Sequence, residues 1–124
     1  MQLYFTDEHQ WVRLSADGLT ATIGISTHAQ DALGDIVFVD LPAIGKSFAQ
    51  MDVGAVVESV KTAADVLMPL GGEVVEVNEE LRADPALANT APMDSGWFIK
   101  IKLDSSKTAD ELARLIPEDA YLPN

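Results

Sequence analysis

A short valine-rich pattern occurs twice in this chain, and it constrains the fold more than any other feature of the sequence. Residues 54–58 read Gly-Ala-Val-Val-Glu, and residues 72–76 read Gly-Glu-Val-Val-Glu. Because β-branched residues favour extended conformations, each copy is predicted to form a strand. Two such similar strands indicate an internal repeat. The alternative explanation is that two buried strands merely share a valine-rich composition.

Lys61 lies between the two copies, in a stretch of small residues. Valines precede this stretch and apolar residues follow it at 66–68, which predicts a hairpin with Lys61 at or beside its tip. A lysine at that position has a flexible stem and an amine that an enzyme can reach and acylate. Of the five lysines, only Lys61 has Glu-Ser-Val before it and Ala-Ala-Asp shortly after it. The alternative is an ordinary solvated lysine.

The charge of the chain argues against two classes of partner. Its 124 residues include 20 acidic and 8 basic side chains, which gives a formal net charge of −12. Nucleic acids and anionic membranes require positive contact surfaces, so neither is expected to bind. Proteins with basic docking faces are the expected partners. The length and the hydrophobic content of 48% predict a single globular domain over residues 1–124.

The absence of cysteine excludes disulfides, a thiolate nucleophile and a sulfur-rich metal site. The first residues show neither the basic and apolar pattern of a secretory leader nor an Arg-rich amphipathic pattern. No apolar run approaches the roughly 18 residues that a membrane-spanning helix needs. These observations predict a cytoplasmic bacterial protein.

Strand and turn signals dominate the chain, which predicts a mainly β fold with short peripheral helices. An Asp-Gly pair at 17–18 suits a tight hairpin turn. Alternation in the strand at 35–41 places Ile36 and Phe38 on the face opposite Val37 and Val39. Besides the hairpin around Lys61 and the second valine-rich copy, strands are predicted at residues 11–14, 19–25, 35–41, 47–50 and 97–103.

Capping signals predict a helix after the strand at 19–25. Thr27 and Gln30 have the spacing of a capping box, and Gly34 is suited to end the helix. Ala29, Ala32 and Leu33 then share one helical face.

Three further helices are predicted in the second half of the chain. Asn78 is expected to cap a short helical turn, and Asp84-Pro85 to start another with proline at the first helical position. A second capping box at 108–111 opens a C-terminal helix that ends at Pro117. The apolar residues of that helix share one face and are Leu112, Leu115 and Ile116.

Several stretches of the sequence together resemble the glycine cleavage system H-protein family. They are residues 21–25, 29–39, 58–66, 72–78 and 96–101. The resemblance extends from about Tyr4 to Tyr121. The run at 29–39 separates this family from other lipoyl domains, and Val-Lys-Thr around Lys61 matches neither acyltransferase lipoyl domains nor biotin carriers. The resemblance implies a hybrid barrel-sandwich fold of the lipoyl/biotinyl type.

The same resemblance implies a carrier function without catalysis by the chain itself. Lys61 would bear lipoic acid in amide linkage, attached by a lipoate-attaching enzyme. The arm would take the aminomethyl group of decarboxylated glycine from a pyridoxal-phosphate glycine decarboxylase. A tetrahydrofolate-dependent aminomethyltransferase would receive that group, and dihydrolipoamide dehydrogenase would reoxidise the dithiol. In such systems the cofactor carries the chemistry and the protein presents it.

Four further residues are candidate site residues by this resemblance. Glu58 and Asp65 would help the attaching enzyme recognise the hairpin, although charged residues beside a hairpin often serve only for solvation. His9 and Gln10 would lie near the cleft into which the family's loaded arm is thought to fold. The family usually has Glu where this chain has Gln10, and an amide pairs less strongly than a carboxylate with a cationic group.

The sequence leaves other functions open. An H-like protein that relays lipoyl groups to other complexes is the main alternative, and a structural β domain with unmodified Lys61 is another. An enzyme is disfavoured because the sequence has no catalytic triad pattern, phosphate-binding glycine loop or metal motif. His9 and His28 lack the spacing of a metal pair and are expected to be structural or exposed. A monomer is expected.

Overall fold

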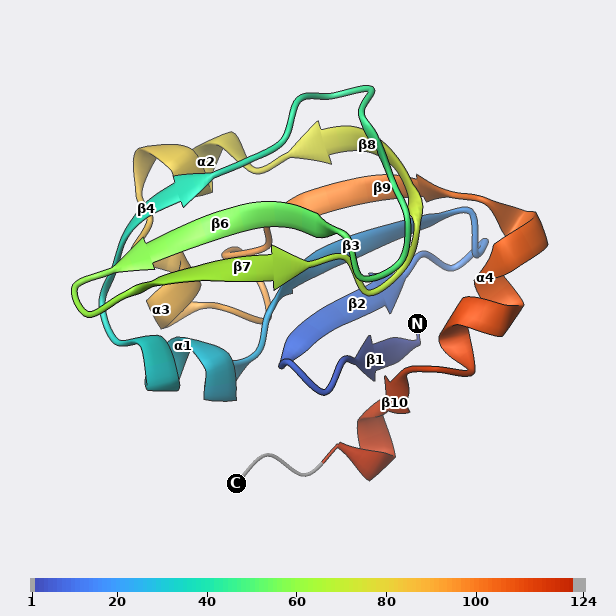
Figure 1. Cartoon of the computed structure of the whole chain (residues 1–124), viewed down its shortest axis with the longest axis horizontal. Coiled ribbons are helices and arrows are strands. Elements are labelled where there is room, and N and C mark those ends of the chain that lie inside the picture. The colour runs from blue at the N-terminus through green and yellow to red at the C-terminus, as the bar shows by residue number, and fades with distance from the viewer. Residues whose placement is uncertain (1, 122–124) are drawn as a thin grey trace.

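Two antiparallel sheets form the framework of the molecule (Figure 1). The computed structural model describes residues 2–121. The larger sheet has the strand order β10-β1-β2-β3-β9-β8-β5, and the smaller sheet has the order β4-β6-β7. The strands are β1 (Leu3–Phe5), β2 (Gln10–Leu14), β3 (Thr20–Ile25), β4 (Ile36–Asp40), β5 (Ser47–Phe48), β6 (Val53–Ser59), β7 (Ala63–Leu67), β8 (Gly72–Val77), β9 (Ile99–Leu103) and β10 (Ile116–Pro117). The prediction of a mainly β fold is confirmed.

The predicted strands are present, with changes at their ends. β2 and β3 form the expected hairpin, and Gly18 in its turn has a positive φ of 72°. β9 begins at Ile99 rather than at residue 97, and β5 ends two residues early. Two strands, β1 and β10, are not predicted from the sequence. Both are short, and they depend on a pairing of distant segments in which Tyr4 lies opposite Pro117.

The predicted alternation in β4 is wrong. Ile36 and Val39 are buried, whereas Val37 and Phe38 are 56% and 50% exposed. The pairing of β4 with β6 shifts its register between Ile36 and Phe38. A bulge of this kind adds a residue to one strand and changes the face of the residues that follow it. β4 therefore presents two neighbouring apolar side chains to solvent.

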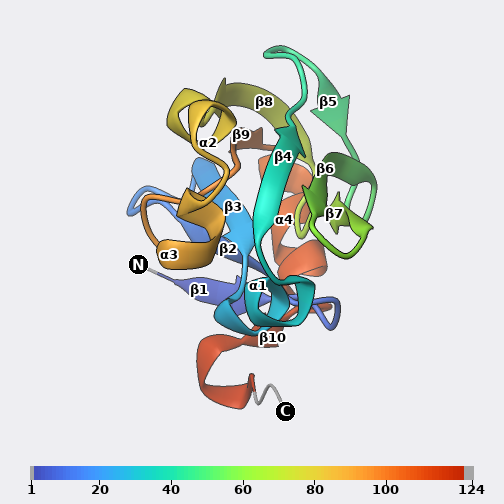
Figure 2. The same ribbon diagram turned by 90° about the vertical axis from the view of Figure 1, so that its left-hand side faces the viewer.

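Helical segments cover the ends and one edge of the sheets (Figure 2). They are α1 (Thr27–Leu33), α2 (Glu79–Ala83), α3 (Leu87–Thr90), α4 (Ser105–Leu112) and the 3₁₀ turn η1 (Glu118–Ala120). Asn78 caps α2 as predicted, because its side chain accepts the N–H of Glu80. α3 begins two residues after Pro85, the predicted first helical position. None of the helices within residues 2–121 is long and apolar enough to cross a membrane.

The predicted N-cap of α1 is wrong by one residue. Ser26, not Thr27, caps this helix, and its hydroxyl accepts the N–H of Ala29 at 3.1 Å. The N–H of Ser26 donates to the carbonyl of His9, which holds Ser26 in the extended conformation that a cap requires. Gly34 ends the helix as predicted, with a positive φ of 79°.

The predicted start and apolar face of the C-terminal helix are also wrong. α4 is capped by Asp104, so Thr108 lies inside the helix. The hydroxyl and the N–H of Ser106 donate to Asp104 and lower the pKa of that carboxyl. The helix ends at Leu112, before Leu115, and Ile116 belongs to β10 instead. Ile116 pairs with Phe5 of β1, so it joins the sheet instead of continuing the helix.

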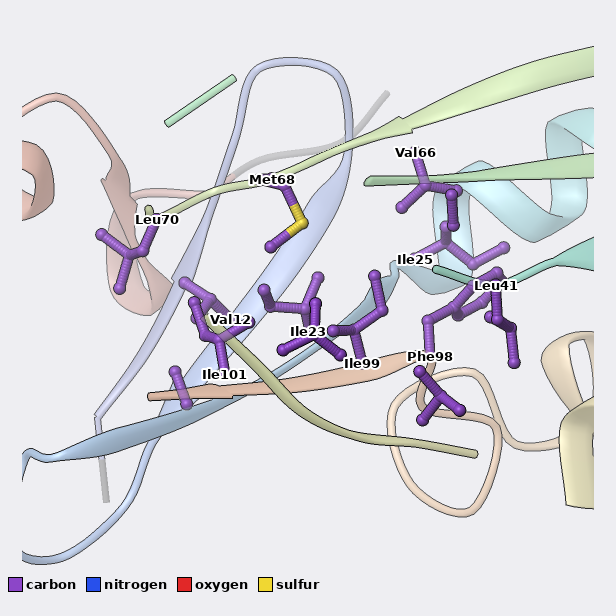
Figure 3. Packing of buried hydrophobic residues seen from close by; sticks show 14 of the residues in the cluster. Val12, Ile23, Ile25, Leu41, Val66, Met68, Leu70, Phe98, Ile99 and Ile101 are labelled. Carbon is purple, nitrogen blue, oxygen red and sulfur yellow. The ribbon is translucent and has the colours of Figure 1, made fainter. Parts of the chain in front are cut away.

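The main core lies between the two sheets (Figure 3). Apolar side chains from β2, β3 and β9 pack against those of the hairpin β6–β7 and the segment that follows it. Burial of one such side chain contributes about 1.5–3 kcal/mol. The fully buried members include Val12, Ile23, Val57, Met68, Leu70, Ile99 and Ile101.

The two valine-rich copies form strands as predicted, one in β6 and the other in β8. Their burial differs, because Val57 is buried while Val75 at the corresponding position is 43% exposed. A register shift in β8 between Val74 and Glu76 turns Val75 outward. The sequence repeat therefore predicts two strands but not two equivalent faces.

The glycine that opens each copy marks a close approach between elements. A Cβ atom added to Gly72 would overlap the backbone carbonyl oxygen of Lys102. A Cβ atom added to Gly54 would overlap the side chain of Met68. The first neighbour is fixed by the sheet, whereas the second is a flexible side chain.

We predict that Gly72→Ala lowers the free energy of unfolding by about 2 kcal/mol, and that Gly54→Ala lowers it less. Met68 is able to change its rotamer, but the carbonyl of Lys102 moves only with its strand. Urea unfolding of both variants and the wild type measures the difference. A larger loss for Gly54→Ala would contradict this account.

Candidate functional site

Lys61 lies in a tight loop at the tip of the hairpin β6–β7, as predicted, and its side chain is exposed. We call residues 59–62 the attachment loop. The hydroxyl of Ser59 accepts the N–H groups of Lys61 at 3.1 Å and Thr62 at 3.2 Å. The N–H of Ser59 donates to the carbonyl of Thr62 at 2.8 Å. These bonds give the exposed loop one defined conformation.

The attachment loop rests on the chain that leaves α1. The N–H of Val60 donates to the carbonyl of Asp35 at 3.0 Å. A Cβ atom on Gly34 would lie 3.3 Å from Cε of Lys61, so the lysine stem passes directly over this glycine. Gly34 thus ends α1 with its positive φ and leaves room for the Lys61 stem.

Asn89 of α3 holds the segment that leaves α1 through three hydrogen bonds. Its Nδ2 donates to the carbonyl of Gly34 at 2.8 Å and to Oε1 of Gln30 at 3.0 Å. Its Oδ1 accepts the N–H of Ile36 at 2.8 Å. Sequence analysis does not identify Asn89, because its partners lie more than 50 residues away in the chain.

A groove of about 440 Å³ lies between α1 and the hairpin, and we call it the α1–hairpin groove. One wall comes from α1 and the other from residues of β6 and β7. The lining is mostly apolar or small in side chain. It consists of Glu8, His9, Gln10, Ile25, His28, Ala29, Ala32, Leu33, Val57, Ala64, Asp65, Val66 and Leu67.

The predicted residues His9, Gln10 and Asp65 all line this groove, whereas Glu58 does not. Glu58 lies across from Phe38 on β4 and is exposed on the outer side of the hairpin. Three of the four candidates around Lys61 are therefore brought together.

His9 is fixed at the groove by contacts from three segments. Its backbone has a positive φ of 70°, which is uncommon for a residue with a side chain. Its Nδ1 and the hydroxyl of Tyr121 share a hydrogen bond of 2.5 Å, and the hydroxyl also bonds to Ser26 at 3.1 Å. The ring packs on that of His28, with 4.3 Å between centroids.

Gln10 is buried, and both ends of its amide have partners. Oε1 accepts the hydroxyl of Thr6 at 2.6 Å, and Nε2 donates to the carbonyl of Glu8 at 3.2 Å. The amide is therefore committed to the turn before β2. Among the described residues that line the groove, the carboxylates are those of Glu8 and Asp65.

Sequence analysis missed His28 as a groove residue and treated it as structural or exposed. The helical face of Ala29, Ala32 and Leu33 was the available signal, since the spacing of a helix places position 28 beside position 32. Within residues 2–121, no three His, Asp or Glu side chains are grouped to hold a metal ion.

The two sheets, with a lysine at the tip of the hairpin β6–β7, define a hybrid barrel-sandwich domain of the lipoyl/biotinyl type, as predicted. A crystal structure of a glycine cleavage system H protein from Mycobacterium marinum aligns with a TM-score of 0.75 and 32% sequence identity. The alignment covers 88% of this chain and 94% of that one.

The sequence comparisons agree with the structural one. Residues 3–122 match the family described as Glycine cleavage H-protein. The chain is 55% identical over 120 residues to the glycine cleavage system H protein of Chromobacterium violaceum. This alignment covers 97% of this chain and 91% of that one. The chain is 48% identical to the glycine cleavage system H protein of Aeromonas salmonicida, and the alignment covers 97% of this chain and 90% of that one. The chain belongs to the glycine cleavage H-protein family.

We predict that Ser59→Ala speeds amide hydrogen exchange at Lys61 and Thr62 without unfolding the protein. The variant loses the acceptor of two N–H groups, and such bonds are worth about 1 kcal/mol each. Exchange rates from NMR measure the effect, with Ser59→Thr as the control that keeps the hydroxyl. Unchanged exchange in Ser59→Ala would show that the hydroxyl does not order the loop.

Proposed function

We propose that this chain is the lipoyl-bearing carrier of a glycine cleavage system, with lipoic acid attached to Lys61. The observation that supports this most directly is an exposed lysine on an ordered hairpin tip, beside a groove with apolar walls. Family membership adds to it, since the relatives are named glycine cleavage system H proteins. One carrier domain would span residues 1–124, of which Met1 and residues 122–124 lie outside the described part.

The chemistry of attachment suits Lys61. Its amine attacks the activated carbonyl carbon of a lipoyl donor, and a C–N bond forms as the bond to the leaving group breaks. The leaving group departs with the electron pair, and the ammonium gives up two protons to become an amide nitrogen. The lysine charge is thereby removed. Glu58 and Asp65 lie exposed on the hairpin strands on either side, where an attaching enzyme would meet them.

The α1–hairpin groove fits the lipoyl arm in chemistry. An aliphatic chain ending in a dithiolane is apolar, and the helix and hairpin offer apolar walls such as Leu33 and Val66. When bound, the group supplies a disulfide that accepts the aminomethyl unit of decarboxylated glycine. The chain's own contribution is to orient the arm and keep water from it.

Glu8 and Asp65 supply the negative charge of the groove in this proposal. Gln10 is a poor partner for a cationic aminomethyl group because its oxygen already accepts the Thr6 hydroxyl. His9 and His28 also line the groove, and their rings are in contact at a tilt of 46°. The usual family carboxylate at position 10 is thus replaced by neighbouring carboxylates on the groove wall.

The proposed partners follow from the family. The pyridoxal-phosphate glycine decarboxylase loads the arm, the tetrahydrofolate-dependent aminomethyltransferase unloads it, and dihydrolipoamide dehydrogenase reoxidises it. A lipoate-attaching enzyme modifies Lys61 beforehand. The chain itself is proposed to be non-catalytic, monomeric and cytoplasmic. A relay of lipoyl groups to other complexes is the alternative role, and it would use the same lysine.

We predict that Lys61 alone is lipoylated. Lys61→Arg keeps the charge but removes the acylable amine, so the fold should persist while the lipoyl mass shift disappears. Intact mass and peptide mapping of protein from lipoate-fed cells measure this. Lys46, Lys100, Lys102 and Lys107 serve as internal controls. Lipoate on any of these four would contradict the assignment.

We predict that Asp65→Asn shortens the lifetime of the loaded arm. The carboxylate is exposed, so its pairing with the aminomethyl ammonium is worth at most about 1 kcal/mol, or about fivefold in rate. The measurement is ammonia and formaldehyde release without the aminomethyltransferase. Asp31→Asn is the matched control, because Asp31 is exposed on α1 but does not line the groove. Equal release from both variants would show that Asp65 does not shelter the arm.

A further inference from the structure

The hairpin that carries Lys61 has a second face, which points away from the α1–hairpin groove. Val57 lines the groove, and because side chains alternate along a strand, its neighbours Val56 and Glu58 on β6 point to the other side. The register places Phe38, Glu58 and Ala63 in one row across the three strands. In Figure 1 the strands β6 and β7 lie in front of the larger sheet, with this side toward the viewer.

Large apolar side chains are exposed on this face, close to Lys61. Phe38 is 50% exposed, Val37 is 56% exposed and Val60 is 65% exposed. Phe38 lies opposite Glu58 on β6, and Val60 follows two residues later in the attachment loop. Among the large apolar side chains exposed in residues 2–121, Phe38 is the one aromatic. We call Val37, Phe38, Val60 and Glu58 the outer hairpin face.

The two chain segments that form the outer hairpin face carry mostly negative charge. The segments 35–41 and 53–67 contain four acidic residues and a single basic one, Lys61. The acidic side chains are all exposed, and they are Asp35, Asp40, Glu58 and Asp65. Acylation would remove the one positive charge within these two segments. A complementary surface would therefore combine an apolar recess with surrounding basic side chains.

A second copy of the chain does not suit this face. Two copies would bring two sets of four carboxylates together, and the net charge of −12 adds further repulsion. The edge strand β4 also carries a bulge between Ile36 and Phe38, and such a bulge discourages strand addition at a sheet edge. The face is thus suited to side-chain contacts with a different protein.

We propose that the lipoate-attaching enzyme docks on the outer hairpin face, with Phe38 as the apolar anchor. This rests on the proposed function, since it assumes that Lys61 is the acylated residue. The enzyme needs access to the lysine while the carrier stays folded, and this face lies beside Lys61 without involving the groove. Exposed aromatic residues surrounded by polar groups are typical anchors of protein interfaces.

The test is steady-state kinetics of lipoate attachment to the purified unmodified carrier. Phe38→Thr keeps β propensity and should raise KM for the carrier at least about tenfold, with kcat little changed. Ile44→Thr is the matched control, because Ile44 is 65% exposed on the loop after β4. Its KM should equal that of the wild type. Thermal melts of both variants confirm that the fold is retained.

Each outcome of this experiment is decisive. An unchanged KM for Phe38→Thr, with wild-type Lys61 modified normally, overturns the docking proposal and leaves the proposed function intact. Absence of lipoate on wild-type Lys61 overturns the proposed function itself. A defect of Phe38→Thr that appears only with the decarboxylase assigns the face to a later partner and overturns the proposal. Sedimentation that shows a wild-type dimer lost in Phe38→Thr also overturns it.

Discussion

The hydrogen bond between the N–H of Val60 and the carbonyl of Asp35 joins the parts of the site to each other. This bond connects the tip of the hairpin to the segment that leaves α1. The hairpin and α1, which form the two walls of the groove, are therefore held together at that end. Gly34 and Asn89 make that junction possible, the first through its missing Cβ and the second through three hydrogen bonds. A hairpin without this support would present Lys61 in many positions.

The hairpin held by this hydrogen bond has two faces with different surroundings. The inner face lines the α1–hairpin groove, which the proposed function assigns to the apolar arm. The outer face carries Phe38 and exposed carboxylates, which suit a protein surface rather than a small apolar group. Strand alternation gives this separation on β6, because Val57 lines the groove and its neighbour Glu58 points to the other side. Under the proposed function, a partner bound to the outer face would leave the groove open to the arm.

Local patterns in the sequence predicted much of this arrangement. The hairpin around Lys61, the end of α1 at Gly34 and the cap at Asn78 depend on neighbouring residues, and all three are found. The bulges in β4 and β8 were not predicted, because they depend on which strand lies alongside. Asn89 and the pairing of β1 with β10 were missed for the same reason. The cap of α1 was predicted at Thr27 instead of Ser26, because the contact of Ser26 with His9 is not visible in the local pattern.

The most direct test of the account compares backbone NMR shifts of the unmodified, lipoylated and aminomethyl-loaded protein. The account predicts shifts that extend from Lys61 along the α1–hairpin groove to Ala32, Val66 and His9 when the arm is loaded. The strand β8, on the larger sheet, should be unaffected and serves as the internal reference. Shifts confined to the attachment loop in all three forms would contradict the account, because the arm would then remain in solvent.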